Sequence, residues 1–368
     1  MSATEAVVPT RIDAISPEWL TEVLRTVGAC TPDGKVAAAE HERIALGSGF
    51  TSNLYRSHLT ISGAGPSSVI IKLPSDAEQY RQLGVGTGMY SREIDYYQAV
   101  APAVPLRAPY SYFANRGEEP GSFVLVLEDL QNFDAADHLE GLSIERAERV
   151  IEEVAGLHAW SMGPGRALLE GLSFPAEDDP LLQALPPIAF SVGWDTYLAN
   201  ARHPLPPALD GLNARLSAAL PCLLEALAQP RVLVHGDLRA DNLFFDDAGV
   251  PTIVDYQLAR WGAGMTDIAY LISQGLRTED RRGQDQRLLD VYQKALVDHG
   301  VPTLDDEVLW QQYRLATLMQ IIYPLAAMMG WSDLPHRARD LCLTLVERAI
   351  ATAVDINAVH ALDQLTAT

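Results

Sequence analysis

The residues with the clearest capacity for chemistry lie in one short stretch of the second half of the chain. Asp237 and Asn242 are five positions apart after the apolar run 232–234, and Asp255 follows the run 252–254. Strands at those two runs would bring the three side chains to a common edge. Phosphoryl transfer requires a carboxylate facing the attacking hydroxyl and oxygen ligands for Mg²⁺. The spacing therefore predicts Asp237 as a catalytic base and Asn242 and Asp255 as metal ligands.

The order of these residues also matches a kinase catalytic loop. His235, Asp237 and Asn242 reproduce His-x-Asp-x-x-x-x-Asn, and Asp255 stands where a later metal-binding aspartate is expected. The alternative is a polar turn with a helix-capping aspartate. An isolated Asp-x-x-x-x-Asn would be interpreted in that way. The combined spacing and apolar flanks favour the catalytic interpretation.

Such a site needs a loop whose backbone can approach phosphate groups, and the segment 47–53 has suitable small residues. It directly precedes the partly alternating run 54–61. Small side chains let backbone N–H groups come close to a phosphate. An ordinary loop is an equal alternative for this segment. The predicted phosphate contacts come from Gly47, Ser48, Gly49 and Ser52.

A strand lysine and a helix glutamate are the next expected parts. Lys72 ends the apolar run 68–71 in a chain that has only three lysines, and Glu93 lies on the predicted helix 90–100. We expect Glu93 to pair with Lys72, which would then bind nucleotide phosphates. The alternatives are a strand-end lysine that reaches solvent and an ordinary exposed glutamate.

The run 123–127 leads into Glu128 and Leu130 at the point where the strand-rich part of the chain ends. In a two-lobed kinase this segment is a hinge that offers backbone groups to adenine. We expect the carbonyl of Glu128 and the N–H of Leu130 to make these contacts.

The distribution of patterns predicts an α+β fold. A lead-in helix begins at Ser16 and Pro17, and strand patterns then dominate from about 42 to 130. A long helix at 144–161 opens a mainly helical remainder, in which 243–245 and 252–254 form a hairpin. Segregated layers of this kind argue against an alternating βα fold. We expect an N-terminal lobe at 1–130 and a helical C-terminal lobe at 131–368.

Taken together, these motifs resemble the superfamily of aminoglycoside phosphotransferases and choline kinases, nearest to its ecdysteroid-kinase-like branch. The resemblance spans about residues 47–271 and implies a protein-kinase-like bilobal fold with ATP-dependent phosphorylation of a small-molecule alcohol. By position, Asp237 resembles the base, Asn242 and Asp255 the Mg²⁺ ligands, and Lys72 with Glu93 the α/β-phosphate pair. His235 and Asp267 resemble residues that orient the catalytic loop, and His158 a packing position. The resemblance rests on Val126-Leu-Glu128-Asp129-Leu, Leu157-His158-Ala-Trp160, His235-Gly-Asp237-Leu, Asp255-Tyr-Gln-Leu and Asp267-Ile-Ala-Tyr.

Departures from protein kinases narrow the interpretation. The glycine loop has Ser52 and Asn53 where a third glycine would stand, so a serine side chain would replace one backbone contact. Only eleven residues separate Asp255 from Asp267, which leaves no room for a long activation segment. A protein kinase is therefore disfavoured. A non-catalytic nucleotide-binding module stays as an alternative, although no feature of the sequence supports it.

Composition limits the partners. The 368 residues carry a formal charge of −21, so nucleic acids and anionic membranes are poor partners. Three distant cysteines argue against a disulfide framework, and no secretory signal precedes the first helix pattern. The uncharged run 315–332 contains Gln320 and Pro324 and predicts a buried, kinked helix instead of a membrane span. We expect a cytoplasmic protein, whose oligomeric state the sequence leaves open.

The acceptor is the least determined part of the prediction. No dense acidic run marks a pocket for a cationic aminoglycoside, which favours a moderately apolar hydroxylated acceptor. Aminoglycosides are the alternative. Ordinary helix core is the competing interpretation of the apolar residues that could line the pocket, namely Trp160, Phe190, Trp194, Tyr197, Tyr323, Met328, Met329 and Trp331.

Overall fold

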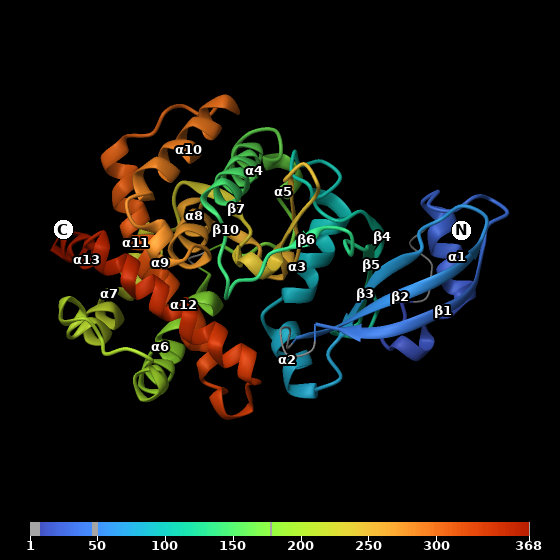
Figure 1. The fold of residues 1–368 in the computed structure, drawn as a ribbon, viewed down its shortest axis with the longest axis horizontal. Coiled ribbons are helices and arrows are strands. Elements are labelled where there is room, and N and C mark those ends of the chain that lie inside the picture. The colour runs from blue at the N-terminus through green and yellow to red at the C-terminus, as the bar shows by residue number, and fades with distance from the viewer. Residues whose placement is uncertain (1–7, 46–50, 177–178, 368) are drawn as a thin grey trace. The chain divides into compact units, whose positions relative to one another are not determined.

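The computed structural model of the chain describes residues 8–45, 51–176 and 179–367. The chain divides into two compact units, one formed by 1–103 with 107–132 and the other by 104–106 with 133–368 (Figure 1). Gly47, Ser48 and Gly49 lie outside the described residues.

The first unit is built on a five-stranded antiparallel sheet in the order β1-β2-β3-β5-β4 (Figure 1). Its helix α1 is capped by the Ser16 side chain, which accepts from the Trp19 N–H, and Pro17 occupies the first turn. Apolar residues of α1 such as Leu20 and Leu24 pack in one core with Val69 and Ile71 of the sheet. The elements are α1 (Pro17–Thr26), β1 (Lys35–Ile44), β2 (Ser52–Ser62), β3 (Ser68–Pro74), α2 (Glu78–Gly86), α3 (Met89–Asp95), a π-helical turn (Tyr96–Val100), β4 (Ser111–Arg116) and β5 (Phe123–Glu128).

The second unit is mainly helical and contains two small antiparallel sheets, β6-β8-β9 and β10-β7. The strands β8 and β9 form the hairpin that the turn 246–249 predicts. The helices are α4 (Ile144–Met162), α5 (Arg166–Leu169), α6 (Pro180–Asn200), α7 (Leu212–Ala226), α8 (Met265–Tyr270), α9 (Thr278–Arg281), α10 (Asp285–Asp298), α11 (Asp306–Met328), α12 (His336–Asp355) and α13 (Ala358–Ala367). The strands are β6 (Asp134–Ala135), β7 (Arg231–Val234), β8 (Leu243–Phe245), β9 (Pro251–Ile253) and β10 (Arg260–Ala263).

The predicted α+β class is confirmed, with two local differences. Strand β1 begins at Lys35, earlier than the expected start near 42, because its mostly exposed and partly charged residues give little apolar pattern. Strand β10, which reads Arg-Trp-Gly-Ala, has no strand pattern of its own and forms by pairing with β7. Tertiary pairing therefore overrides weak local propensity at both places.

The uncharged run near the C-terminus is part of α11, which contains Pro324 and is largely buried. No helix among the described residues has both the length and the apolarity that a bilayer crossing demands. Cys30 and Cys342 are buried, Cys222 is exposed, and all three are free thiols.

Candidate active site

The catalytic-loop residues follow strand β7 and are held by backbone geometry. Gly236 has a φ of +82°, and a Cβ at this position would clash with Arg260 and with the Leu258 carbonyl. Only glycine satisfies both constraints without strain. The loop then enters a 3₁₀ turn over Ala240–Asn242 that leads directly into β8. The sequence His-Gly-Asp thus positions Asp237 through its neighbouring glycine.

Asp237 and Asn242 are in direct contact. The amide Nδ2 of Asn242 donates to the backbone oxygen of Asp237 at 2.9 Å and to its carboxylate Oδ2 at 3.2 Å. Both residues are buried, so these contacts form in an environment where hydrogen bonds orient side chains firmly. The guanidinium of Arg239 is also close, with its Nε 3.6 Å from the same carboxylate oxygen. The predicted base and one predicted metal ligand are therefore brought together.

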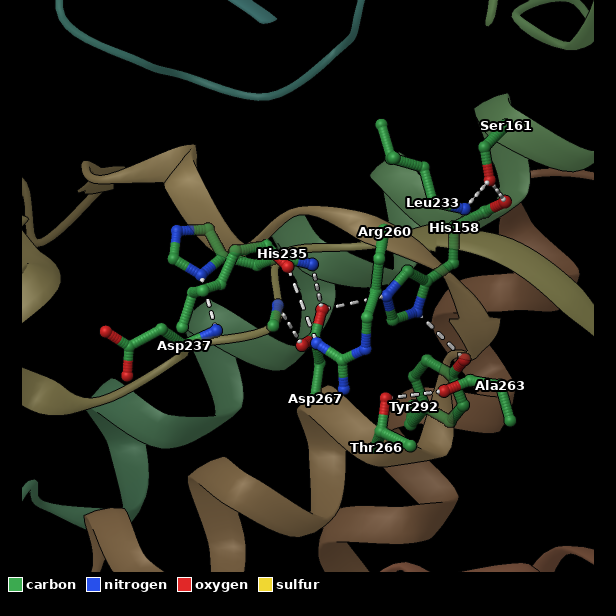
Figure 2. Close-up of polar contacts among 12 residues, drawn as sticks. His158, Ser161, Leu233, His235, Asp237, Arg260, Ala263, Thr266, Asp267 and Tyr292 are labelled. Carbon is green, nitrogen blue, oxygen red and sulfur yellow. Dashed lines mark hydrogen bonds and ion pairs between the residues drawn. The ribbon is translucent and has the colours of Figure 1, made fainter. Parts of the chain in front are cut away.

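A buried network under the loop fixes its backbone (Figure 2). The Asp267 carboxylate accepts from the backbone N–H of His235 at 2.6 Å and from that of Gly236 at 2.9 Å. Burial alone would raise the pKa of Asp267, but the hydrogen bonds from His158 and from the Gly236 N–H hold that pKa below its ordinary value. Figure 2 shows the carboxylate of Asp237 pointing away from this network. Asp267 therefore anchors the loop backbone and leaves Asp237 for other contacts.

His158 is fully buried, yet its ring has polar partners on both sides. Its Nε2 lies 3.3 Å from the Asp267 carboxylate, and its Nδ1 lies 3.0 Å from the Tyr292 hydroxyl. A carboxylate only accepts, so Nε2 carries the proton and Tyr292 donates to Nδ1. A Cβ on Gly264 would clash with this pair. His158 is thus a member of the network that anchors the loop. The family resemblance predicted only a packing role for it.

Asp255 follows β9 in the left-handed region, with φ +69° and ψ +67°. The preceding residue Val254 donates its N–H to the Asn242 backbone oxygen at 3.0 Å. The Val254 carbonyl accepts from His235 Nε2 at 3.0 Å. These bonds hold the backbone segments of Asn242 and Asp255 side by side.

In the first unit, Lys72 and Glu93 form a buried ion pair. Lys72 Nζ lies 2.8 Å from Oε1 and 2.7 Å from Oε2 of Glu93, and both side chains are under 10% exposed, at 7% and 3%. Strand β3 positions the lysine and helix α3 the glutamate. The structure therefore shows the expected pairing.

The remaining expected nucleotide contacts are also in this unit. Ser52 is the buried first residue of β2 and pairs in register with Pro74 of β3. Glu128 ends β5, donates its N–H to the Tyr110 carbonyl at 2.8 Å and accepts from the Tyr110 N–H through its side chain. Leu130 is buried two residues later.

Asp129, between them, has a role that the sequence interpretation missed. Arg56 donates to both of its carboxylate oxygens, at 2.8 and 3.1 Å, and Ser68 donates at 2.7 Å. This bidentate pair ties the end of β5 to β2 and β3. An aspartate directly after a buried apolar strand was the available signal.

One protein family matches most of the chain. The family model described as "Phosphotransferase enzyme family" matches residues 45–318, which is more than half of the chain. The chain belongs to the phosphotransferase enzyme family. None of the curated proteins matches it.

Solved structures share the fold of this phosphotransferase at low sequence identity. Wild-type aminoglycoside 2'-phosphotransferase-IIIa in its GDP complex is 15% identical, with a TM-score of 0.51 over 90% of this chain and 98% of that chain. Choline kinase from Cryptosporidium parvum Iowa II is 13% identical, with a TM-score of 0.51 over 89% of this chain and 90% of that chain. The expected superfamily and the protein-kinase-like fold are thereby confirmed.

The donor set of this phosphotransferase suits a hard cation. Asn242 uses its amide nitrogen on Asp237, so its amide oxygen is the atom left for a ligand, and Asp255 offers carboxylate oxygens. Mg²⁺ prefers oxygen ligands and commonly combines one or two protein donors with phosphate oxygens and water. Within the described ranges, no cluster of three His, Cys, Asp or Glu residues forms a complete cage. The two residues offer the kind of oxygen atom that Mg²⁺ binds.

Two further residues lie against Asp237, the predicted base. Burial raises the pKa of Tyr270 well above its ordinary value, and the charge of Asp237 adds to this shift. Tyr270 belongs to the Asp267-Ile-Ala-Tyr motif, so a signal for it was present in the sequence. Arg239, two residues after the base, was equally visible as a basic residue in the loop.

The expected acceptor walls divide into two groups. Tyr323, Trp160 and Trp331 are partly exposed and Met329 is exposed. Four others are buried in the core, which agrees with the alternative interpretation of these residues as ordinary helix core. The rings of three of them pack against one another along α6. These four are Phe190, Trp194, Tyr197 and Met328.

Proposed function

We propose that this phosphotransferase is a Mg²⁺-dependent kinase that transfers the γ-phosphoryl group of ATP to a hydroxyl of a small molecule. The observation that carries the proposal is the contact between Asn242 Nδ2 and the Asp237 carboxylate at 3.2 Å. It orients a carboxylate beside an amide oxygen on one rigid loop. Phosphoryl transfer depends mainly on such positioning and on charge stabilisation.

Asp237 serves as the general base in this proposal. It holds the acceptor hydroxyl by a hydrogen bond and takes its proton as the new bond to phosphorus forms. Asn242 keeps the carboxylate in one orientation through its amide nitrogen. The Asp267 network holds the backbone on which Asp237 is carried, so the base does not drift from its position.

Asn242 and Asp255 would hold the metal ion. A bound Mg²⁺ supplies positive charge to the phosphate oxygens and orients them. Asp255 is presented by its left-handed backbone, which the αL-tolerant aspartate side chain allows. The hydrogen bond from Val254 to Asn242 keeps these two ligands from separating.

The first unit would bind the nucleotide. Lys72, held by Glu93, would contact the α- and β-phosphates, and the loop with Gly47, Ser48, Gly49 and Ser52 would cover them. The Glu128 carbonyl and the Leu130 N–H would contact adenine on a segment that the Arg56–Asp129 pair stiffens. Because the proposed reaction consumes ATP, we also propose a cytoplasmic location.

We propose a moderately apolar hydroxylated acceptor, with aminoglycosides as the alternative. The partly exposed Tyr323 and Trp331 could contact such a molecule. A short segment links Asp255 to α8, and this favours a small molecule over a protein substrate.

A coupled ADP-release assay with Mg²⁺-ATP tests the proposal. The acceptor panel should include sterols, terpenoid alcohols, macrolides and aminoglycosides, with Asp237→Asn as the matched variant. We expect one acceptor class to accelerate ADP release and Asp237→Asn to lower that rate by about 10²–10⁴-fold while it still binds ATP. An unchanged rate in Asp237→Asn would remove Asp237 from the role of base. Acceleration by aminoglycosides alone would replace the proposed acceptor class.

A further inference from the structure

The guanidinium of Arg239 is an enclosed cation with an unfilled hydrogen-bonding capacity. Its side chain is 19% exposed and lies two residues after Asp237 on the catalytic loop. Its closest carboxylate oxygen, Oδ2 of Asp237, is 3.6 Å from Nε, which is an ion-pair distance but too long for a hydrogen bond. Its Nε is buried without a partner. Within the described ranges 8–45, 51–176 and 179–367, its side chain makes no hydrogen bond.

Two other enclosed guanidiniums of the same unit each donate to two or more oxygen atoms, although the Nε of Arg281 is also buried without a partner. Arg348 donates to the carbonyl oxygens of His138, Gln274 and Leu139 at 2.8–2.9 Å. Arg281 donates to the carboxylates of Asp285 and Asp355. A buried donor without a partner loses its hydrogen bonds to water and gains none, so such a group requires an explanation.

The surrounding charges hold Arg239 in place without satisfying it. The Asp237 charge, with smaller contributions from Asp255 and Asp241, raises the pKa of Arg239 above its ordinary value, so the group is always a cation. Asp241 itself accepts from the His138 N–H at 2.9 Å and pairs with Arg337. Arg239 is thus drawn toward the base by charge, while its N–H donors stay available for another oxygen-bearing group.

The reaction brings such a group to this position. An attacking hydroxyl must lie about 2.6–3.2 Å from the Asp237 carboxylate and about 3–3.5 Å from the phosphorus atom. The phosphorus atom then lies within about 7 Å of the same carboxylate that Arg239 contacts, and its oxygens surround it. A planar guanidinium matches a phosphoryl group with two parallel hydrogen bonds.

We propose that Arg239 binds the phosphoryl group during its transfer. This inference rests on the proposed kinase function. The acceptor oxygen forms its bond to phosphorus as the bond to the bridging oxygen of ADP breaks, and the hydroxyl proton passes to Asp237. Arg239 keeps its protons throughout and donates hydrogen bonds to the phosphoryl oxygens, where negative charge is spread in the transition state.

The test uses the full chain with ADP, Mg²⁺ and aluminium fluoride, a planar mimic of the transferring phosphoryl group. We expect Arg239→Gln to bind ADP as the wild type does, but to lose about 10²–10³-fold in affinity for the ADP–fluoroaluminate combination. Hydrolysis of ATP with water as acceptor should fall by a similar factor. Arg231→Gln removes an exposed arginine of β7 and should change neither quantity.

Each other outcome is decisive. Unchanged fluoroaluminate affinity in Arg239→Gln overturns the proposal, and an effect confined to the KM of an acceptor assigns the guanidinium to acceptor binding instead. If Arg239→Gln does not fold, Arg239→Lys takes its place, because lysine keeps the charge but loses the two-pronged geometry, and it should lose at least tenfold in fluoroaluminate affinity. A wild-type chain that binds neither ADP nor ATP contradicts the proposed function itself, which separates that failure from failure of the Arg239 assignment.

Discussion

Asp267 accepts a hydrogen bond from the backbone N–H of His235 at 2.6 Å, and its second carboxylate oxygen accepts from Gly236 at 2.9 Å. In the part of the chain that the structure describes, these two N–H groups are not paired with a neighbouring strand. One buried carboxylate accepts hydrogen bonds from both of them instead. Because Asp237 follows directly after these residues, its position depends on a side chain thirty positions later in the sequence.

This arrangement predicts a pH-dependent contribution of Asp267 to stability. Its pKa is lowered in the folded protein, so its contribution is present in full above the unfolded-state pKa and is lost as the pH falls through the folded-state value. Asp267→Asn should lower the free energy of unfolding by about 3 kcal/mol at neutral pH, since an amide cannot accept from both N–H groups. Urea denaturation at a series of pH values should show the difference between variant and wild type shrinking toward acid pH. A difference that stays constant down to pH 3 would show that ionised Asp267 contributes nothing.

Because Lys72 and Glu93 form an ion pair, we expect the effects of substituting them on the free energy of unfolding to be strongly non-additive. Glu93→Gln removes the carboxylate charge that lies 2.7 Å from the buried Lys72 Nζ and should destabilise the chain by about 3–5 kcal/mol. The double variant Lys72→Met with Glu93→Gln should cost less than Glu93→Gln alone, although we expect it to bind ATP poorly. Urea denaturation of the single and double variants completes the cycle. Simple additivity of the two costs would argue against a coupled buried pair.

The proposed metal ligand Asp255 predicts a loss of Mg²⁺-dependent nucleotide binding. Asn tolerates the left-handed backbone of this residue, so Asp255→Asn should fold normally while losing the carboxylate charge. ATP with Mg²⁺ at about 100 times its Kd stabilises a binding protein by about 2.7 kcal/mol, and the variant should lose most of this increment. Thermal denaturation with ATP, with and without EDTA, measures it.

Two comparisons make this prediction specific. Asp247→Asn, in the exposed turn between β8 and β9, should keep the full stabilisation by Mg²⁺-ATP. EDTA should reduce the wild type to the level of Asp255→Asn. Equal stabilisation of the wild type and Asp255→Asn by Mg²⁺-ATP would remove Asp255 from the metal site.

Gly264 predicts a steric effect on the network under the catalytic loop. A Cβ at this residue would lie 2.6 Å from His158 Nδ1 and also clash with the Tyr292 hydroxyl. Gly264→Ala should therefore cost about 1–3 kcal/mol of stability and weaken the anchoring of the loop. Gly275→Ala is the matched control, because its added Cβ would meet nothing closer than 3.5 Å. Thermal denaturation compares the two, and equal melting temperatures would contradict the expected crowding.

Much of the candidate site in the second unit could be predicted from the sequence because its residues are close together along the chain. The order of His235, Asp237, Asn242 and Asp255 and the flanking apolar runs were enough to predict the loop and the hairpin behind it. The pair of Lys72 and Glu93 was predictable for a related reason, since each lies on a strongly patterned element.

Contacts across long sequence separations were not predictable. Tyr292 lies 134 positions from His158, and nothing in the local pattern of α10 marks its hydroxyl as a partner of a histidine on α4. Arg56 and Asp129 are 73 positions apart, and only the packing of β2, β3 and β5 brings them together. Four apolar residues offered as acceptor walls proved to be core because periodicity reports that a face is buried, not what it is buried against.

The sequence by itself determined the class of fold and the identity of the groups around the catalytic loop, because local spacing dictates which residues share a turn or a strand end. Only the tertiary structure decided which N–H groups Asp267 binds, that His158 takes part in the same network, and that the Arg239 side chain makes no hydrogen bond to the described residues. Hydrogen bonding and burial depend on distances in space, and chain folding sets those distances between segments that the sequence keeps far apart.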